Sequence, residues 1–472
     1  MTPRMSPAAT LSVRKFSFLE LSHGASARPS TIQTMSTGLP SYDDAAAMVF
    51  AYAEKLRGGR AAAARRHTER VELAAAAGRV LAQDICADRD QPPFARSTRD
   101  GFACRAAEAS KHEPLSLAGA TRAGQTPAGP LPPGSVWEIM TGAPVPTGAD
   151  AVVMVEHVKQ ADGLVRLLHG RKVSAGENIV AQGAQAHQGD ELIAAGIPIT
   201  FAQIALAASC GYSTIEVYSR PRVAILATGD ELVAVDAVPG PGQIRNSNAP
   251  MLAAMVAAAG GEPWILPAAA DTAEALDKVL ADATEADLLL ISGGVSAGKF
   301  DLVEPALARM GARFHFTGVR IQPGKPLVFG ELPVRAKAGG RGAAKQRPLP
   351  FFGLPGNPIS SAVTFLLFAA PMMAALAGSL DSLPRFVMAQ LKVTTDRRTK
   401  PGLTRFLPAR STFSIAGSGI ASGTGGRPPE VEVVPWQGSG DLAALARSNC
   451  FLVIPEEAGS LEADEMVRIL LP

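Results

Sequence analysis

Short apolar runs alternate with helix-like segments in the second half of the chain. The runs at 223–227 and 288–291 are typical of buried strands, and each ends at a glycine-containing turn. Segments 250–259 and 272–283 have helical composition, and 264–266 is strand-like. Strands that alternate with helices predict a parallel sheet with helices on both faces. Ligands of such sheets bind beyond the carboxyl ends of the strands.

The first half of the chain has a different pattern. Residues 43–81 are rich in Ala, with Glu, Arg and Leu interspersed, and predict helix that is broken at Gly58 and Gly59. From 88 to 189 Pro and Gly are frequent and the apolar runs are short, which predicts a small domain of strands and loops. A second helical stretch is expected at 200–210.

The end of the chain returns to strands. After Pro384, short alternating strands such as 431–434 predict a small β domain. The basic, glycine-containing residues 334–348 are interpreted as a loop inserted in a hairpin, because no aromatic residues are interleaved as in a nucleic-acid surface. The apolar stretch 362–378 contains Pro371 and is short for a membrane span, so a buried helix is predicted.

Composition narrows the class of protein. A chain of 472 residues exceeds one ordinary core, so roughly two to four domains are expected. A hydrophobic share of 47% and a charged share of 19% fit a soluble, well-buried protein, and a net charge of +2 argues against a nucleic-acid-binding face. The cysteines are widely spaced and form no CxxC pair, which fits a reducing cytoplasm without a thiolate zinc site: Cys86, Cys104, Cys210 and Cys450.

The first 35 or so residues are basic and rich in Ser and Ala. This composition could pass for a transit peptide, but it lacks the apolar core of a secretory signal. A disordered tail over 1–38 is the preferred interpretation, and residues before Met35 are expected to be dispensable.

Two loops follow the predicted strands. In 227–232, a carboxylate just past a strand end can hold a hard cation, although a helix N-terminus also favours acidic residues. In 292–298, three glycines and two serines let backbone N–H groups converge on an anion, and Asp301 adds a candidate metal ligand. The loop lacks the GK[ST] ending of a Walker A motif, so nucleotide hydrolysis is not implied. A flexible turn remains the alternative for this loop.

Further candidates lie on tight turns. The segments 322–326 and 353–358 are rigid Pro-Gly turns, and Lys325 could meet a phosphate or an oxyanion. In the small β domain, Asp100 and Thr141 supply a carboxylate and a hydroxyl on glycine-containing turns. Together the residues indicate a metal-assisted phosphate or oxyanion site in an α/β domain.

The motifs resemble those of one family. Their strings are, in order, PPFARSTRDGFA, EIMTGAPVPTGADAVVMVE, VAILATGDELV, GQIRNSN, LLLISGGVSAGKFD, QPGKPLVFG and GLPGNP. In this order they are similar to the molybdopterin molybdenumtransferase family, which includes the C-terminal region of gephyrin. The resemblance covers the chain from about Tyr42 to the end.

The resemblance implies a multidomain α/β plus β fold. A central molybdopterin-binding α/β domain with a parallel-rich sheet would occupy 220–383, and a barrel-like β domain 384–472. An elongated helical domain, 39–87 and 186–219, would be interrupted by the small β domain, 88–185. The family resemblance further implies a cytoplasmic homodimer whose cleft is shared between subunits, with a molybdopterin adenylyltransferase as a possible partner, and no nucleic acid or membrane.

The resemblance also assigns chemistry. Molybdate would displace the adenylate of adenylylated molybdopterin and give molybdenum cofactor and AMP. The catalytic residues would be Asp100, Thr141, Glu231, Asp271 and Asp301. Of these, Glu231, Asp271 and Asp301 would serve Mg²⁺ and the phosphate side, while Asp100 and Thr141 would come from the other subunit to the molybdate and dithiolene side. Substrate would lie along Ser292, Gly293, Gly294, Val295, Ser296, Gly298, Pro323, Gly324, Lys325, Pro355, Gly356, Asn357 and Pro358.

The chain departs from the family pattern at several positions. Gln185 stands where an acidic residue is usual, Lys299 replaces a common acidic residue, and Gln322 stands where a basic residue often precedes the Pro-Gly-Lys turn. Arg99 and Phe102, which flank Asp100, also differ. These changes keep open an alternative in which a paralogue carries molybdopterin or finished cofactor, or acts as a scaffold.

Overall fold

The computed structural model describes residues 38–58, 67–269, 272–294, 303–335, 346–395, 402–412 and 428–472. The chain divides into Met1–Gly38 and Leu39–Pro472, and the description below concerns the second unit. The predicted tail therefore lies outside the described residues, apart from Gly38.

The central domain is built on a mixed six-stranded sheet. Its strand order is β16-β13-β17-β21-β20-β18. The first four strands are mutually parallel; β20 pairs antiparallel with β21, and β18 pairs antiparallel with β20 at the edge. Their bounds are β16 Glu262–Ile265, β13 Arg222–Ala227, β17 Leu288–Ser292, β21 Gln346–Leu354, β20 Val328–Arg335 and β18 Arg313–Phe316. The predicted parallel-rich sheet is confirmed.

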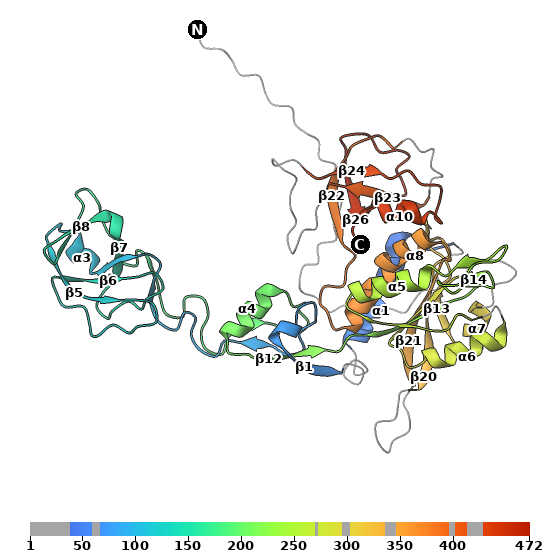
Figure 1. Ribbon diagram of the computed structural model, residues 1–472, viewed down its shortest axis with the longest axis horizontal. Coiled ribbons are helices and arrows are strands. Elements are labelled where there is room, and N and C mark those ends of the chain that lie inside the picture. The colour runs from blue at the N-terminus through green and yellow to red at the C-terminus, as the bar shows by residue number, and fades with distance from the viewer. Residues whose placement is uncertain are drawn as a thin grey trace, which may run out of the picture. The chain divides into compact units, whose positions relative to one another are not determined.

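Helices cover both faces of this sheet (Figure 1). Alternate residues of β13 enter two separate cores, as expected for a strand buried on both sides. Ile225 packs with α5 and the α8–α9 segment, while Leu226 packs with α6 and α7. The helices are α5 Asn248–Ala258, α6 Ala273–Ala283, α7 Val303–Arg309, α8 Pro358–Thr364 and α9 Ala370–Leu376. Helices were predicted at the positions of α5 and α6, and both are confirmed.

One helical segment, Pro358–Leu376, is long and apolar enough to cross a membrane by length and composition alone. Most of it, 78%, is buried inside the protein, so the predicted buried helix is confirmed. Between α8 and α9 the backbone forms a π-helical segment, η3 Phe365–Ala369. It ends two residues before Pro371, whose ring cannot fit against the carbonyl four residues earlier in a regular helix.

The N-terminal helix α1, Tyr42–Gly58, packs on the central domain. Tyr42 is buried and makes an edge contact with Phe368, 6.0 Å between ring centroids.

The predicted helix over 59–81 is wrong where the structure describes it. Thr68–Glu72 forms β1, which pairs antiparallel with β12, Thr214–Tyr218. This long-range pairing overrides the helical composition of the segment.

The remaining elements near α4 are short. Helix α4, Phe201–Ser209, is confirmed, and its capping box joins Thr200 and Gln203. Strand β2, Ile85–Cys86, pairs with β11, Glu191–Ile193, and a 3-10 turn, η1, covers Leu73–Ala75.

The small β domain contains a six-stranded sheet in the order β7-β4-β6-β5-β9-β8. Phe102 and Ala103, neighbours on β4, belong to two different apolar cores, so both faces of the sheet are covered. The elements are β4 Gly101–Cys104, α3 Ala106–Ala109, β5 Leu115–Thr121, β6 Ser135–Ile139, β7 Ala151–Met154, η2 Val155–His157, β8 Val158–Ala161 and β9 Leu164–Leu167. Beside the sheet, β3 Arg96–Ser97 pairs with β10 Ile179–Val180.

The C-terminal β domain is a closed barrel. The order is β19-β23-β24-β22-β26-β25, and β25 pairs back onto β23. The elements are β19 Ile321–Gln322, β22 Phe386–Leu391, β23 Thr404–Ser411, β24 Glu430–Val433, α10 Leu442–Arg447, β25 Cys450–Ile454 and β26 Met466–Leu470. The expected hairpin around 334–348 is present as the antiparallel pair β20–β21, although its tip, 336–345, lies outside the described residues.

Candidate functional site at the carboxyl edge of the sheet

Three neighbouring parallel strands deliver the predicted turns to one edge. The last residues of β13, β17 and β21 are in register, Ala227 with Ser292 and Ser292 with Leu354. The turns beyond them are joined by backbone hydrogen bonds, from Thr228 N to Ser292 O at 3.0 Å and from Gly293 N to Leu354 O at 3.1 Å. The sequence prediction that these loops meet at one ligand-binding edge is therefore supported by the geometry.

The two residues after β17 must be glycines, because neighbouring atoms leave no room for a side chain. Gly293 and Gly294 have positive φ angles of +90° and +63°. A Cβ on Gly293 would lie 2.6 Å from Thr228 O, and one on Gly294 would lie 2.7 Å from Val303 Cγ2. A Cβ on Gly356, in the turn after β21, would lie 3.7 Å from Gly293 Cα. The two turns thus touch through bare backbone, which leaves their polar groups for a ligand.

Part of the predicted site lies outside the described residues. This holds for Asp271, Val295, Ser296, Gly298, Lys299 and Asp301. Their predicted roles stay predictions.

Glu231 is the predicted metal ligand that the structure describes. It lies between β13 and β14, Leu232–Val233, and its backbone carbonyl accepts a hydrogen bond from Ile244 N at 2.8 Å. Ile244 begins β15, Ile244–Arg245, which pairs parallel with β14. The Glu231 carboxylate folds over Gly229, where a Cβ would collide with it, and Gly229 has a φ of +143°. This places carboxylate oxygens directly after β13.

The neighbouring side chain Thr228 is buried, and its Oγ1 has no hydrogen-bond partner among the described residues. The atom lies 2.8 Å from the position of a Cβ on Gly294. Oxygen donors of this kind fit a hard cation such as Mg²⁺. No group of three or more His, Cys, Asp or Glu side chains within the described ranges could hold a metal, so Glu231 would need partners outside those ranges.

The Pro-Gly-Lys turn lies against α8. A Cβ on Gly324 would meet Thr364 Cγ2 at 2.7 Å, and Pro323 is buried while Lys325 is exposed. Gln322, which replaces the usual basic residue, is the parallel Cα partner of Arg405 in the barrel. The substitution therefore stands beside a buried arginine on the next strand.

Two elements that contact the site were not predicted from the sequence. Asn248, the first residue of α5, donates from Nδ2 to Ser292 Oγ at 2.8 Å and to Gly356 O at 2.6 Å. The string GQIRNSN contained this residue but gave no role for it. The barrel segment before α10 reaches the start of α8, where Ile359 N donates to Ser439 O at 3.0 Å. A Cβ on Gly440 would lie 3.6 Å from Asn357 Oδ1.

Asp100 and Thr141 come together in the small β domain. Asp100 directly precedes β4, and Thr141 follows β6, its antiparallel neighbour. Asp100 Oδ1 accepts from Thr141 N at 2.6 Å and from Thr141 Oγ1 at 2.8 Å. These bonds, first the backbone N–H and then the hydroxyl, hold the pKa of the exposed Asp100 carboxyl below its usual value. The Asp100 carboxylate is therefore ionised and is held in a fixed orientation by Thr141.

Within one described chain, the Asp100–Thr141 pair and the sheet edge are not joined by a hydrogen bond or an ion pair. No described hydrogen bond or ion pair joins Gln185 to Glu231 either. It is exposed, and its N–H donates to Gln91 O at 2.8 Å in the pair of segments that leads into the small β domain.

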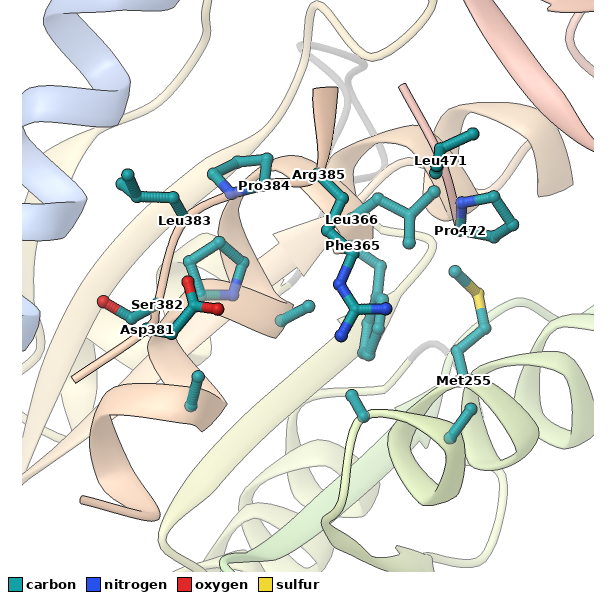
Figure 2. A pocket seen from close by; sticks show the side chains of 15 residues that line it. Met255, Phe365, Leu366, Asp381, Ser382, Leu383, Pro384, Arg385, Leu471 and Pro472 are labelled. Atoms are coloured by element: carbon teal, nitrogen blue, oxygen red, sulfur yellow. The ribbon is translucent and has the colours of Figure 1, made fainter. Parts of the chain in front are cut away.

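A cavity of about 270 Å³ opens elsewhere, between the central domain and the C-terminal β domain (Figure 2). It lies at the carboxyl end of α5, whereas the candidate site lies at its beginning. Its lining is largely apolar and includes Met255, Phe365, Leu366, Arg385 and Leu471. None of the predicted site residues lines it, so the sheet edge remains the candidate functional site.

The fold and the edge define a class: a multidomain protein whose α/β domain offers glycine turns and a carboxylate to a ligand at the ends of parallel strands. Comparison with known families agrees. Residues 41–211 match the MoeA N-terminal region (domains I and II), 224–375 match the probable molybdopterin binding domain, and 390–471 match the MoeA C-terminal region (domain IV).

Individual relatives cover most of the chain. A molybdopterin molybdenumtransferase of Bacillus subtilis is 34% identical over 415 residues, 86% of this chain and 90% of the relative. A molybdopterin molybdenumtransferase of Nostoc is 37% identical over 349 residues, 72% of this chain and 76% of the relative. A crystal structure of the molybdopterin biosynthesis moeA protein from Pyrococcus horikoshii OT3 is 27% identical, with a TM-score of 0.71 over 92% of this chain and 100% of the other. The chain belongs to the molybdopterin molybdenumtransferase family.

Proposed function

We propose that this chain inserts molybdate into adenylylated molybdopterin and releases AMP, giving molybdenum cofactor. The observation that carries the proposal is the convergence of the turns after β13, β17 and β21 at one edge, in a chain of this family. The relatives are named as transferases, and a carrier or scaffold is not favoured by that comparison.

In this proposal the glycine turns bind the anionic part of the substrate. The Gly293 N–H already donates to Leu354 O, but the backbone N–H groups of Gly294 and Gly356 have no side chains in the way and can donate to phosphate or pterin oxygens. Lys325, Pro323, Pro355, Asn357 and Pro358 would extend this surface along α8. The described turns at this edge are already bonded to one another, so ordering them on binding costs little.

Mg²⁺ is proposed at the phosphate side. Glu231 would hold it, with Asp271 and Asp301 as further ligands. When bound, the cation would neutralise the charge of the phosphoanhydride. The oxygen chemistry of Glu231 and of the buried, unpartnered Thr228 Oγ1 supports such a cation in this region.

Asp100 and Thr141 are proposed to act on the molybdate and dithiolene side. Both hydrogen-bond donors of Thr141 are directed to Asp100, so the carboxylate is oriented before substrate arrives. An ionised carboxylate in this position can accept a proton from a dithiolene thiol as sulfur becomes a metal ligand. We further propose that a second subunit brings this pair to the sheet edge, which makes the protein a homodimer. The same proposal places it in the cytoplasm, where an adenylyltransferase would supply its substrate.

The test is reconstitution of a molybdenum-free apo-enzyme that becomes active only with finished cofactor. The chain, adenylylated molybdopterin and molybdate are incubated with Mg²⁺ or with a chelator, and activity is then assayed. Activity is expected with Mg²⁺ and not with the chelator. Equal activity without the chain would overturn the proposed function, and activity unaffected by the chelator would overturn the role of the cation.

A further inference from the structure

The first residue of α5 bridges two walls of the candidate site. Asn248 Nδ2 donates both to Ser292 Oγ, at the end of β17, and to Gly356 O, in the turn after β21. The bonded residues are 44 and 108 positions away in the sequence. A single amide group therefore sets the separation of two turns that are predicted to bind substrate.

The orientation of this amide is fixed by its partners. Gly356 O can only accept, so the group that faces it must be the NH₂ and not the carbonyl oxygen. Asn248 Oδ1 then points elsewhere, where it is buried without a hydrogen-bond partner among the described residues. A buried acceptor left unpaired lowers the stability of the folded state. Stability alone therefore does not explain why an asparagine stands at position 248, and its two bridging hydrogen bonds need another explanation.

Helix capping does not supply that explanation. The cap of α5 comes from Asn246, whose Oδ1 accepts from Ala249 N at 3.1 Å. Ser247 precedes the helix and makes no side-chain capping bond. Two asparagines at one helix start therefore have separate tasks, and only Asn248 reaches the sheet edge.

We propose that Asn248 is a positioning residue that presets the spacing of two turns, residues 292–294 at the end of β17 and the Gly356-Asn357 turn after β21. This inference rests on the proposed function, because these two turns are argued to bind the pterin substrate. Apart from Asn248, the described bond between these turns is the one from Gly293 N to Leu354 O. That bond lies at the strand ends, so without the amide no described hydrogen bond holds Gly356 at its distance from Ser292.

In the proposed function both turns contact the substrate and the product away from the bond that reacts. Removing the amide should therefore weaken binding rather than slow the chemical step. The net contribution of a typical hydrogen bond corresponds to roughly a 2- to 10-fold change in affinity, which is the loss expected without the amide. Uniform loss of binding raises KM and leaves kcat nearly unchanged.

The test compares three single variants with the wild-type full-length chain. Asn248→Asp keeps the shape but removes both N–H donors and places a carboxylate against Gly356 O. Asn248→Ala removes the group altogether, in case the aspartate variant does not fold. Asn246→Ala is the matched control, because it removes an asparagine two positions away that only caps the same helix. Metal-free molybdopterin is titrated by fluorescence, KM and kcat for AMP release are measured, and melting temperature is recorded.

Asn248→Asp and Asn248→Ala are expected to bind molybdopterin more weakly, with raised KM and little change in kcat. Asn246→Ala is expected to lower the melting temperature and leave molybdopterin affinity unchanged. Normal molybdopterin affinity in a folded Asn248 variant, or an equal loss in Asn246→Ala, would overturn the inference. A wild-type chain that neither binds molybdopterin nor releases AMP would instead overturn the proposed function on which it rests.

Discussion

At the scale of single residues, the hydrogen bonds that Thr141 donates to Asp100 keep the Asp100 carboxyl ionised. The backbone N–H of Thr141 is the first cause of the lowered pKa and its hydroxyl is the second. An aspartate with a lowered pKa stabilises the folded state above its unfolded pKa, and this contribution is lost as pH falls through the folded value. Asp100 should therefore remain ionised throughout the neutral range and well into acid.

The first prediction separates the two causes. In Thr141→Val the hydroxyl is lost but the backbone N–H remains, so the pKa of Asp100 should rise only part of the way to its ordinary value. Thr141→Ser, which keeps the hydroxyl, is the control and should leave it unchanged. Carbon-13 NMR titration of the Asp100 carboxyl measures both. An ordinary pKa in the wild-type chain would show that the pair does not form.

The second prediction concerns Gly293. A methyl group there would lie 2.6 Å from Thr228 O, on a backbone with φ of +90°. Gly293→Ala should lower the free energy of unfolding by about 1–3 kcal/mol from backbone strain, and the clash should open the turn and weaken molybdopterin binding. Urea unfolding and molybdopterin titration measure the two effects.

Gly163→Ala is the control for strain alone. Gly163 has φ of +74° and no atom within 4 Å of its Cβ position. It should lower stability and leave binding intact. Equal molybdopterin affinity in Gly293→Ala and the wild type would contradict the close contact described at the sheet edge.

At the scale of elements, the sequence predicted the strands that carry the site. The runs that became β13 and β17 are apolar throughout because helices cover both faces of the sheet, and that signal is local. Thr228 and Gly293 directly follow these two strands, so the sequence placed them at the sheet edge, whereas Gly356 entered the predicted site as part of the Pro-Gly turn 353–358. The resemblance to the family added Asp100 and Thr141, which spacing alone could not distinguish from ordinary turns.

What the sequence did not predict depends on distant partners. Asn248 gains its role from contacts 44 and 108 residues away, and Ser439 reaches α8 from the barrel. Strand β1 was assigned to helix because its pairing with β12 lies almost 150 residues further on. No local pattern of hydrophobic residues contains this information.

The third prediction belongs to the segments that lead into the small β domain. Gln185 is exposed there and is held by its backbone N–H on Gln91 O, so changing its side chain should affect stability little. Gln185→Glu restores the carboxylate usual in the family and should lower the Mg²⁺ concentration for half-maximal AMP release. Weakened support around a metal site typically costs roughly 10–100-fold, which bounds the expected change. Gln185→Asp is the stricter variant, and unchanged Mg²⁺ dependence in both would show that this position has no part in the cation site.

At the scale of the whole molecule, the candidate groups lie on separate domains. Asp100 belongs to the small β domain and Glu231 to the central domain, and neither bonds to the other's domain within the described chain. The proposed homodimer, in which two subunits share each site, would account for this separation.

The fourth prediction tests that arrangement. Asp100→Ala and Glu231→Ala homodimers should each be inactive, because every site lacks one group. When the two are mixed and exchange subunits, each heterodimer should recover one intact site out of two. AMP release from the mixture measures the recovery, and light scattering reports the oligomeric state. A monomer at micromolar concentration, or no recovery after proven exchange, would rule out the shared site.

The most direct measurement of the central claim is AMP release in a single turnover. The chain is mixed with adenylylated molybdopterin and Mg²⁺, molybdate is added or withheld, and AMP is quantified by chromatography. The account predicts AMP in proportion to active sites when molybdate is present and almost none when it is absent. Tight binding of the pterin with no AMP release, with or without molybdate, would contradict the transferase and identify the chain as a carrier.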